Sequence, residues 1–143
     1  MEPTRAITAI TLGVRDVEVS KDFYERGLGL RAVQHVPGEI VFLQGAPGQL
    51  LALWNVTSMP SEYGDVAFGP SAPPVSIGHN VGTRAEVESL VEALLSAGAT
   101  LVSAPSTQDW GGTSACVADP DGYRIDVVHN PLFHVGPDGS VSV

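Results

Sequence analysis

The chain has 143 residues, of which 43% are hydrophobic and 16% are charged, a composition that suits one globular domain and excludes a disordered chain. Its net charge of −9, from 16 acidic and 7 basic residues, argues against nucleic acid and anionic membranes as partners, because both need clustered Lys and Arg. The one cysteine, Cys116, excludes an intramolecular disulfide and a cysteine-rich zinc site, and its apolar neighbours predict a small buried side chain.

The N-terminal residues MEPTRAIT lack the cationic start and the apolar run of a signal peptide. No stretch of about 18 apolar residues is present, so no transmembrane helix is expected. These features predict a cytoplasmic protein. The 16 Gly and 11 Pro residues predict many turns and therefore many short strands.

Residues 5–56 predict a β-α-β-β-β unit, which we call module one. Residues 9–14 alternate larger and smaller side chains with the period of a half-buried strand. Asp16 is placed to cap a helix, and Gly27 and Gly29 are expected to end it. The apolar positions predicted for this helix are Val19, Phe23 and Leu28. Three strand-like runs follow, at residues 31–36, 39–44 and 49–56.

Residues 75–131 repeat this order as module two. A strand at residues 75–83 leads to Thr83, which is placed to cap a helix with Glu86 as its partner in a capping box. Gly98 is expected to stop the helix. Its predicted apolar stripe is Val87, Leu90, Val91, Leu94 and Leu95. Three more strand-like runs follow, at residues 99–105, 112–119 and 123–130.

Residues 57–74, rich in Pro, Gly and Ser, link the two modules. A segment of this length without predicted structure is typical of a functional lid or of a disordered linker, and both alternatives stay open here. Residues 132–143 predict a turn and a short terminal strand that act as a stabilising tail. The whole chain, residues 1–143, is thus expected to form one domain.

A repeated βαβββ unit that ends in the hairpin DPDGYRID, residues 119–126, resembles the vicinal oxygen chelate superfamily. That group includes glyoxalase I, extradiol dioxygenases, fosfomycin-modifying enzymes and bleomycin-binding resistance proteins. The resemblance implies an α+β fold in which two βαβββ modules form a cup-shaped mixed sheet. It covers nearly the whole chain, but a fold shared by unrelated activities does not define the function.

Enzymes of this family hold a divalent metal in the cup through about four His, Glu or Gln side chains, one from the first and one from the last strand of each module. Strand alternation lets these positions be read in this sequence, because parity decides which face a residue occupies. The resemblance places them at Ala9, Ala52, Ser76 and Asp126. Of these, Asp126 is the one good ligand, so no cofactor is favoured.

His79 is the alternative metal ligand, since family members often carry Gly-His before an apolar strand. The register that matches Val81 with Val14 instead pairs His79 with Leu12 and turns it toward the helices. His79 is then a structural histidine. If the register shifts, His79 and Asp126 would form a weak remnant of a metal site.

The same strand faces also offer the lining of an organic-ligand pocket. Trp54 supplies a flat stacking surface, and small residues at positions 9, 52 and 78 leave volume where a metal and its ligands would otherwise lie. Asp126 and Asn80 are candidate polar anchors. The predicted ligand-binding residues are Trp54, Tyr63, Phe68, Ser76, Asn80, Trp110, Asp126 and Val128. Each also has a structural interpretation, such as core or dimer packing for Trp54 and solvation in an open cup for Asp126.

Two classes of function remain open. The first is a metal-independent protein that binds and sequesters an aromatic or antibiotic-like molecule, as the bleomycin-type resistance proteins do, and the resemblance implies a homodimer. The acidic surface would favour cationic ligands. The second is an enzyme: a metal-dependent lyase, isomerase or dioxygenase, or a metal-free enzyme with Asp126 as general base. We favour the binding protein.

Overall fold

The computed structural model describes residues 2–143, and module one is a four-stranded sheet with one long helix. Its elements are β1 (Ala9–Val14), α1 (Val17–Leu28), β2 (Arg31–Val36), β3 (Ile40–Ala46) and β4 (Gln49–Asn55). The strand order is β1-β4-β3-β2, with β1 parallel to β4 and the other pairs antiparallel. β1 therefore lies at one edge of its sheet.

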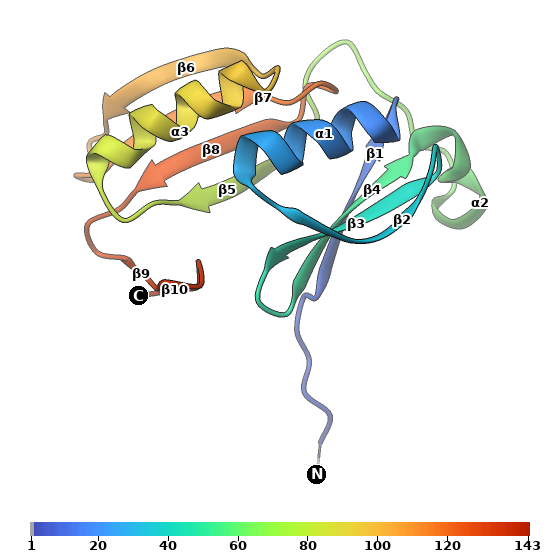
Figure 1. The fold of residues 1–143 in the computed structure, drawn as a ribbon, viewed down its shortest axis with the longest axis horizontal. Coiled ribbons are helices and arrows are strands. Elements are labelled where there is room, and N and C mark those ends of the chain that lie inside the picture. Colours follow the sequence, from blue (N-terminus) through green and yellow to red (C-terminus); the bar gives the residue numbers. More distant parts are fainter. Residues whose placement is uncertain (1) are drawn as a thin grey trace.

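Module two repeats this plan. Its elements are β5 (Ser76–Asn80), α3 (Arg84–Ser96), β6 (Thr100–Thr107), β7 (Thr113–Ala118) and β8 (Arg124–His129). The strand order β5-β8-β7-β6 places β5 at the edge that corresponds to β1. The predicted α+β fold of two βαβββ modules is confirmed, and α1 and α3 pack against each other where the modules meet (Figure 1).

Strand pairing defines which residues of the two modules correspond. Leu12 lies opposite Leu53 in module one, and His79 lies opposite Val127 in module two. The hairpins that join β3 to β4 and β7 to β8 have the same length, because Gln44 pairs with Leu50 as Ala118 pairs with Arg124. Module one and module two can therefore be compared residue by residue at a constant offset of 74 positions along these hairpins.

One face of each sheet packs on the helices and forms the core, and we call the opposite side the helix-free face. The fully buried core side chains include Val14, Phe23, Tyr24, Val41, Leu43, Leu53, Val87, Leu94, Val117, Ile125 and Val127. Alternation along the strands leaves Thr11, Ala52 and Trp54 on the helix-free face of module one.

Both helix caps form as the sequence predicts. Asp16 accepts hydrogen bonds from the backbone N–H groups of Glu18 and Val19 at 3.1 Å each. Thr83 accepts from the backbone N–H of Glu86 at 3.3 Å and donates its hydroxyl to the Glu86 carboxylate at 3.0 Å.

Three expectations about the helices are wrong. Val19 and Leu95 are exposed, because each points away from the stripe that packs on the sheets. Gly27 does not end α1: it lies buried inside the helix, and a Cβ there would be 2.9 Å from Cδ2 of Leu94 on α3. Its missing side chain lets the two helices approach. Gly29, with a φ of 70°, is the residue that ends α1.

The modules are also joined by a polar contact between the β7–β8 turn and α1, which we call the acidic junction (Asp119, Asp121 and Tyr123). Asp121 accepts from the backbone N–H of Arg15 at 2.9 Å and from the hydroxyl of Ser20 at 3.1 Å. The Tyr24 hydroxyl donates to Asp119 at 2.6 Å.

The linker is more structured than a loop. The 3-10 turn η1 (Val56–Ser58) leads into it, and it contains a short helix, α2 (Pro60–Tyr63). Residues 64–75, which follow, form no helix or strand. The tail forms a small hairpin of β9 (His134–Val135) and β10 (Val141–Ser142). Within residues 2–143, no helix has the length and hydropathy needed to cross a membrane.

Candidate functional site

Trp54 is the centre of a polar and aromatic cluster on the helix-free face of module one. Its indole N–H donates to the Glu39 carboxylate at 2.8 Å, and its ring meets Tyr63 edge to face with centroids 5.5 Å apart. The hydrogen bond from Trp54, followed by one from Ser58, lowers the pKa of Glu39. The cluster therefore combines a half-buried aromatic surface with a carboxylate that stays charged at neutral pH.

An apolar cavity of about 290 Å³, which we call the lid cavity, lies beside this cluster. β1 lines one side, and Val56 and Met59 line a second. The remaining lining comes from Tyr123 and from Val66, Ala67, Phe68, Pro73 and Val75. Phe68 projects into it and stacks under the Arg15 guanidinium, whose carbon lies 3.7 Å from the ring centroid. The linker thus covers an apolar space on the edge of the sheet.

Gly13 shapes the lid cavity by having no side chain. A Cβ at this position would lie 2.5 Å from the Met59 sulfur and 3.2 Å from Val56. Met59 consequently packs directly on the β1 backbone and holds η1 and α2 against the sheet. A side chain at position 13 would displace Met59 and open this end of the cavity.

The predicted residues of module two form a separate group. Ser76, Asn80, Asp126 and Val128 share the helix-free face of β5 and β8, and Asp126 is half-buried between Gly78 and Cys116 on the neighbouring strands. Cys116 is half-buried on this face rather than in the core. Burial, and then the nearby Asp126 carboxylate, raise the pKa of its thiol.

Trp110 does not join either group. It lies in the turn before β7, its side chain is 51% exposed, and its ring lies against Gly112, where a Cβ would be 1.8 Å from the indole. Tyr63 is equally exposed but contacts Trp54. The structure therefore places seven of the eight predicted ligand residues in three groups within one chain, namely Trp54 with Tyr63, Phe68 in the lid cavity, and the face around Asp126, and it leaves Trp110 apart.

His79 lies on the helix-packed side of β5, opposite Val127. Burial lowers the pKa of its imidazole, and the nearby Glu86 carboxylate only partly offsets that effect. The ring is accordingly neutral at pH 7. It lies on the opposite face from Asp126, so the two side chains do not converge on one ion.

The four positions at which the family's enzymes bind a metal carry few side chains that could act as ligands. Ala9 and Ala52 have no donor atom, Ser76 has a neutral hydroxyl, and Asp126 has the only carboxylate. A catalytic divalent ion needs several imidazole or carboxylate donors at one point. Among residues 2–143, no group of three His, Cys, Asp or Glu side chains is arranged to hold an ion. These positions do not fit a resident metal.

Sequence reasoning missed Glu39, Met59 and Tyr123 as parts of the site. Tyr123 lines the lid cavity and donates its hydroxyl to the backbone carbonyl of Gly13 at 2.8 Å. Glu39 could have been found from the hairpin register, because its neighbour Ile40 pairs with Trp54. Met59 carries no local signal, since its role depends on how the linker folds back.

Comparison with known proteins agrees with this architecture. A family model described as the glyoxalase/bleomycin resistance protein/dioxygenase superfamily matches residues 6–127. The chain belongs to this superfamily. The resemblance inferred from the repeated unit and the DPDG hairpin is thereby confirmed. A search among curated proteins found no match.

Solved structures of the superfamily resemble the chain over nearly its full length. A glyoxalase-related enzyme from Fulvimarina pelagi shares 36% identity, with 98% of this chain and 99% of that chain covered and a TM-score of 0.88. A glyoxalase/bleomycin resistance protein/dioxygenase from Nocardioides shares 25% identity over 90% of this chain and 85% of that chain, with a TM-score of 0.74. A lactoylglutathione lyase from Agrobacterium tumefaciens, at 21% identity, covers 91% of this chain and 97% of its own with a TM-score of 0.70, a likeness of fold.

Proposed function

We propose that this superfamily member binds and sequesters a flat aromatic molecule, neutral or cationic, without a metal. The observation that carries the proposal is the residue set at the family's metal positions, where Ala9, Ala52 and Ser76 stand in place of His, Glu or Gln ligands. Module one instead presents Trp54 with Tyr63 and, at its β1 edge, the lid cavity. Aromatic walls with few polar groups are what an apolar ligand needs.

The charge around Trp54 supports the preference for a cation. Glu39 stays ionised because the Trp54 N–H holds its carboxylate, and the chain carries a net charge of −9. An acidic site raises the local concentration of cationic ligands and speeds their association, more strongly at low salt. A cationic aromatic compound should therefore bind more tightly than an anionic one of the same size.

A homodimer is part of this proposal. Trp54 and Asp126 lie on different sheets of one chain, so we expect a second copy to present Asp126 to a ligand at Trp54. The apolar side chains exposed on the chain, such as Ile10 and Val75 beside the lid cavity, support coverage by another copy. Light scattering would report a dimer, and a monomer at all concentrations would remove Asp126 from the ligand site.

Tryptophan fluorescence tests the binding proposal. In Trp110→Phe the only tryptophan left is Trp54, so its emission reports the cluster directly. We expect saturable quenching by 9-aminoacridine in the presence of EDTA, and at least about tenfold weaker binding of 2-naphthalenesulfonate. The matched variant Trp54→Phe, which keeps Trp110, should show no saturable change. Equal responses of the two variants, or no quenching at all, would contradict the proposal.

The competing function is catalysis, and Asp126 is the residue that favours it. A half-buried carboxylate on a sheet face is a possible general base, and glyoxalase-related enzymes share this fold. Asp126→Asn keeps the shape of the side chain and removes its basicity. If purified protein turns over a candidate substrate and Asp126→Asn abolishes turnover, the enzyme alternative replaces the binding proposal.

A further inference from the structure

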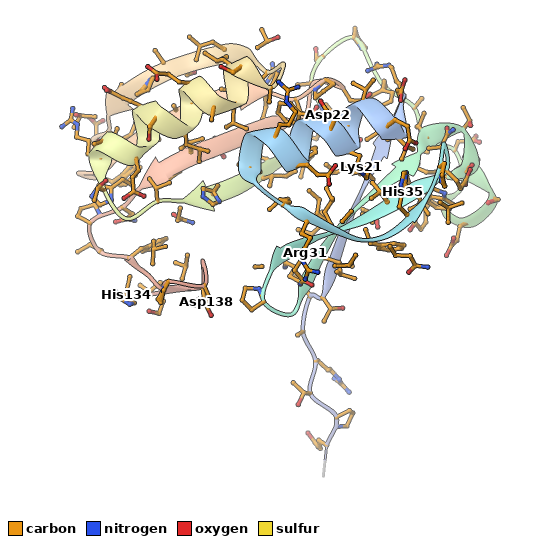
Figure 2. All side chains as sticks on the ribbon, viewed as in Figure 1. Lys21, Asp22, Arg31, His35, His134 and Asp138 are labelled. Atoms are coloured by element: carbon orange, nitrogen blue, oxygen red, sulfur yellow. The ribbon has the colours of Figure 1, made fainter. Side chains whose placement is uncertain are left out.

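A second cavity, about 300 Å³ in volume, lies between the edge strands β1 and β5 and is distinct from the lid cavity. Its walls come from both modules, and the C-terminal residues 139–141 cover its outer side. We call it the inter-module cavity. In Figures 1 and 2 the hairpin that carries His134 and Asp138 lies beside β5 and extends toward the β3–β4 turn, in agreement with this lining.

The repeat shows what this space lacks. At the other end of the module boundary, the Tyr123 ring packs against the core and its hydroxyl donates to the backbone carbonyl of Gly13 at 2.8 Å. By residue count along the two hairpins of equal length, Tyr123 corresponds to Gln49, although the β3–β4 register shifts between Gln44 and Ala46. By strand register, Gly13 corresponds to Asn80. Both Gln49 and Asn80 line the inter-module cavity. The cavity therefore lies where a tyrosine would be if module one had the same turn as module two.

The acceptor for that missing hydroxyl is also in place. Val81 donates its backbone N–H to the carbonyl of Val128, so it directs its backbone groups toward β8. Backbone groups of successive residues in a strand point to opposite sides. Asn80 thus directs its carbonyl to the unpaired edge of β5, as Gly13 does on β1. A backbone carbonyl at a partly enclosed sheet edge is stabilised by a donor.

The walls suit an aromatic ring. Leu28, Leu30 and Leu51 from module one face Ile77 from module two across the space. His79 adds a neutral imidazole, since burial lowers its pKa. A volume of about 300 Å³ is at the lower end of the range for small-molecule sites, so the space suits a single ring better than a fused system.

We propose that the inter-module cavity binds a small phenol, whose ring lies among the leucine and isoleucine side chains and whose hydroxyl donates to the Asn80 carbonyl. The phenol occupies the place that Tyr123 holds at the opposite end. This inference is independent of the function proposed for the Trp54 cluster and the lid cavity, because Ile10 is the one described lining residue that the two cavities share.

Two-dimensional amide NMR of the full chain with 4-methylphenol tests this inference. We expect saturable shifts at Gly78, Asn80 and Gly139, and at least about tenfold weaker binding of toluene, which has the ring but lacks the hydroxyl. Absence of saturable shifts at these amides, or shifts confined to Gly13 and residues 66–68 of the lid cavity, would overturn it. Failure of the Trp54 quenching experiment would leave this result unaffected.

Variants distinguish binding in the inter-module cavity from binding elsewhere on the protein. Gln49→Tyr places the missing ring in the cavity, and Ala46→Leu fills it from the turn, so each should weaken 4-methylphenol binding at least about tenfold. Gln34→Tyr, the same exchange at an exposed position of β2, is the matched control and should bind like the wild type. Unchanged binding by a folded Gln49→Tyr or Ala46→Leu protein would overturn the proposal.

Discussion

The two ends of the module boundary have the same backbone plan but different side chains. At one end the β7–β8 turn presents Asp119, Asp121 and Tyr123 to α1 and β1, and all three side chains form hydrogen bonds there. At the other end the corresponding positions of the β3–β4 turn are Gly45, Pro47 and Gln49. The first end is closed, and the second encloses the inter-module cavity.

The turns themselves are stabilised by different means. Asp119 accepts from the backbone N–H groups of Asp121 and Tyr123, at 2.9 Å each, and so orders its own turn while bonding Tyr24. Gly45 has no side chain for this, and the Gln44 amide instead donates to the carbonyls of Ala46 and Gln49. Only the acidic turn combines local order with contact to the other module. The two modules therefore share one fold but differ where they meet. The acidic junction stabilises one end of the boundary, and the other end contains the inter-module cavity.

The largest expected effect is the loss of the acidic junction. Asp121→Ala leaves the buried Ser20 hydroxyl and the Arg15 backbone N–H without their acceptor, and should lower the free energy of unfolding by about 3 kcal/mol. Pro47→Ala, the matched change in the β3–β4 turn, should change it by less than about 0.5 kcal/mol. Urea denaturation measures both, and equal losses would show that the two ends do not differ in stability.

Tyr24→Phe should lower the free energy of unfolding by about 2 kcal/mol, because it removes a hydrogen bond to a buried carboxylate. It should also change how steeply the stability of the protein falls at alkaline pH. Burial, reinforced by Asp119, raises the pKa of Tyr24 above its usual value of 10.0. The folded protein holds this proton more tightly than the unfolded chain, so wild-type stability falls as pH rises above 10.0.

Denaturation midpoints measured across this alkaline range give the test of Tyr24. Tyr24→Phe should show a shallower decline, with a residual slope from Tyr123, whose pKa burial also raises. Identical alkaline slopes in the two proteins would contradict a buried, protonated Tyr24 at the junction.

Gln49→Tyr tests the comparison in the opposite direction. It gives the β3–β4 turn, beside the inter-module cavity, the tyrosine that the β7–β8 turn carries at the corresponding position. Filling the cavity should raise the free energy of unfolding by about 1 kcal/mol. Calorimetry measures the gain. Tyr123→Gln is the reciprocal change, and it should destabilise because the Gly13 carbonyl loses its donor. A stabilising Tyr123→Gln would contradict the assigned correspondence.

The smallest expected effect concerns His79, which takes the place of Leu12. Its pKa is lowered by burial below the usual 6.5, so its stability contribution is full above pH 6.5 and is lost as pH falls toward the folded pKa. His79→Leu should reduce the acid dependence of the denaturation midpoint below pH 6.5. An unchanged slope would place the ring in solvent.

Much of the fold could be predicted from local patterns. The duplicated βαβββ order, both N-caps and the faces of Ala52, Trp54 and Asp126 follow from spacing and alternation within single strands or helices. These features need no knowledge of distant contacts. Strand alternation also predicted that His79 in module two corresponds to Leu12 in module one.

The rest depends on contacts between distant segments. Asp119 and Asp121 are 95 and 101 residues from Tyr24 and Ser20, so the DPDG sequence indicated a turn but not a buried junction. Val19 fits a helical period yet is exposed, because tertiary packing selects another stripe. Both cavities form where the linker or the C-terminal hairpin folds over an edge strand, which no local pattern reports.

Ligand affinity with and without metal tests the central claim most directly. Titration of 9-aminoacridine into Trp110→Phe should give dissociation constants that agree within about twofold in EDTA and in the presence of one equivalent of Zn²⁺ or Ni²⁺. The reason is that Asp126 alone among the four family metal positions carries an anionic donor, which is too few to hold an ion. Elemental analysis of the same protein checks its metal content. Stoichiometric metal together with loss of binding on chelation would contradict the account.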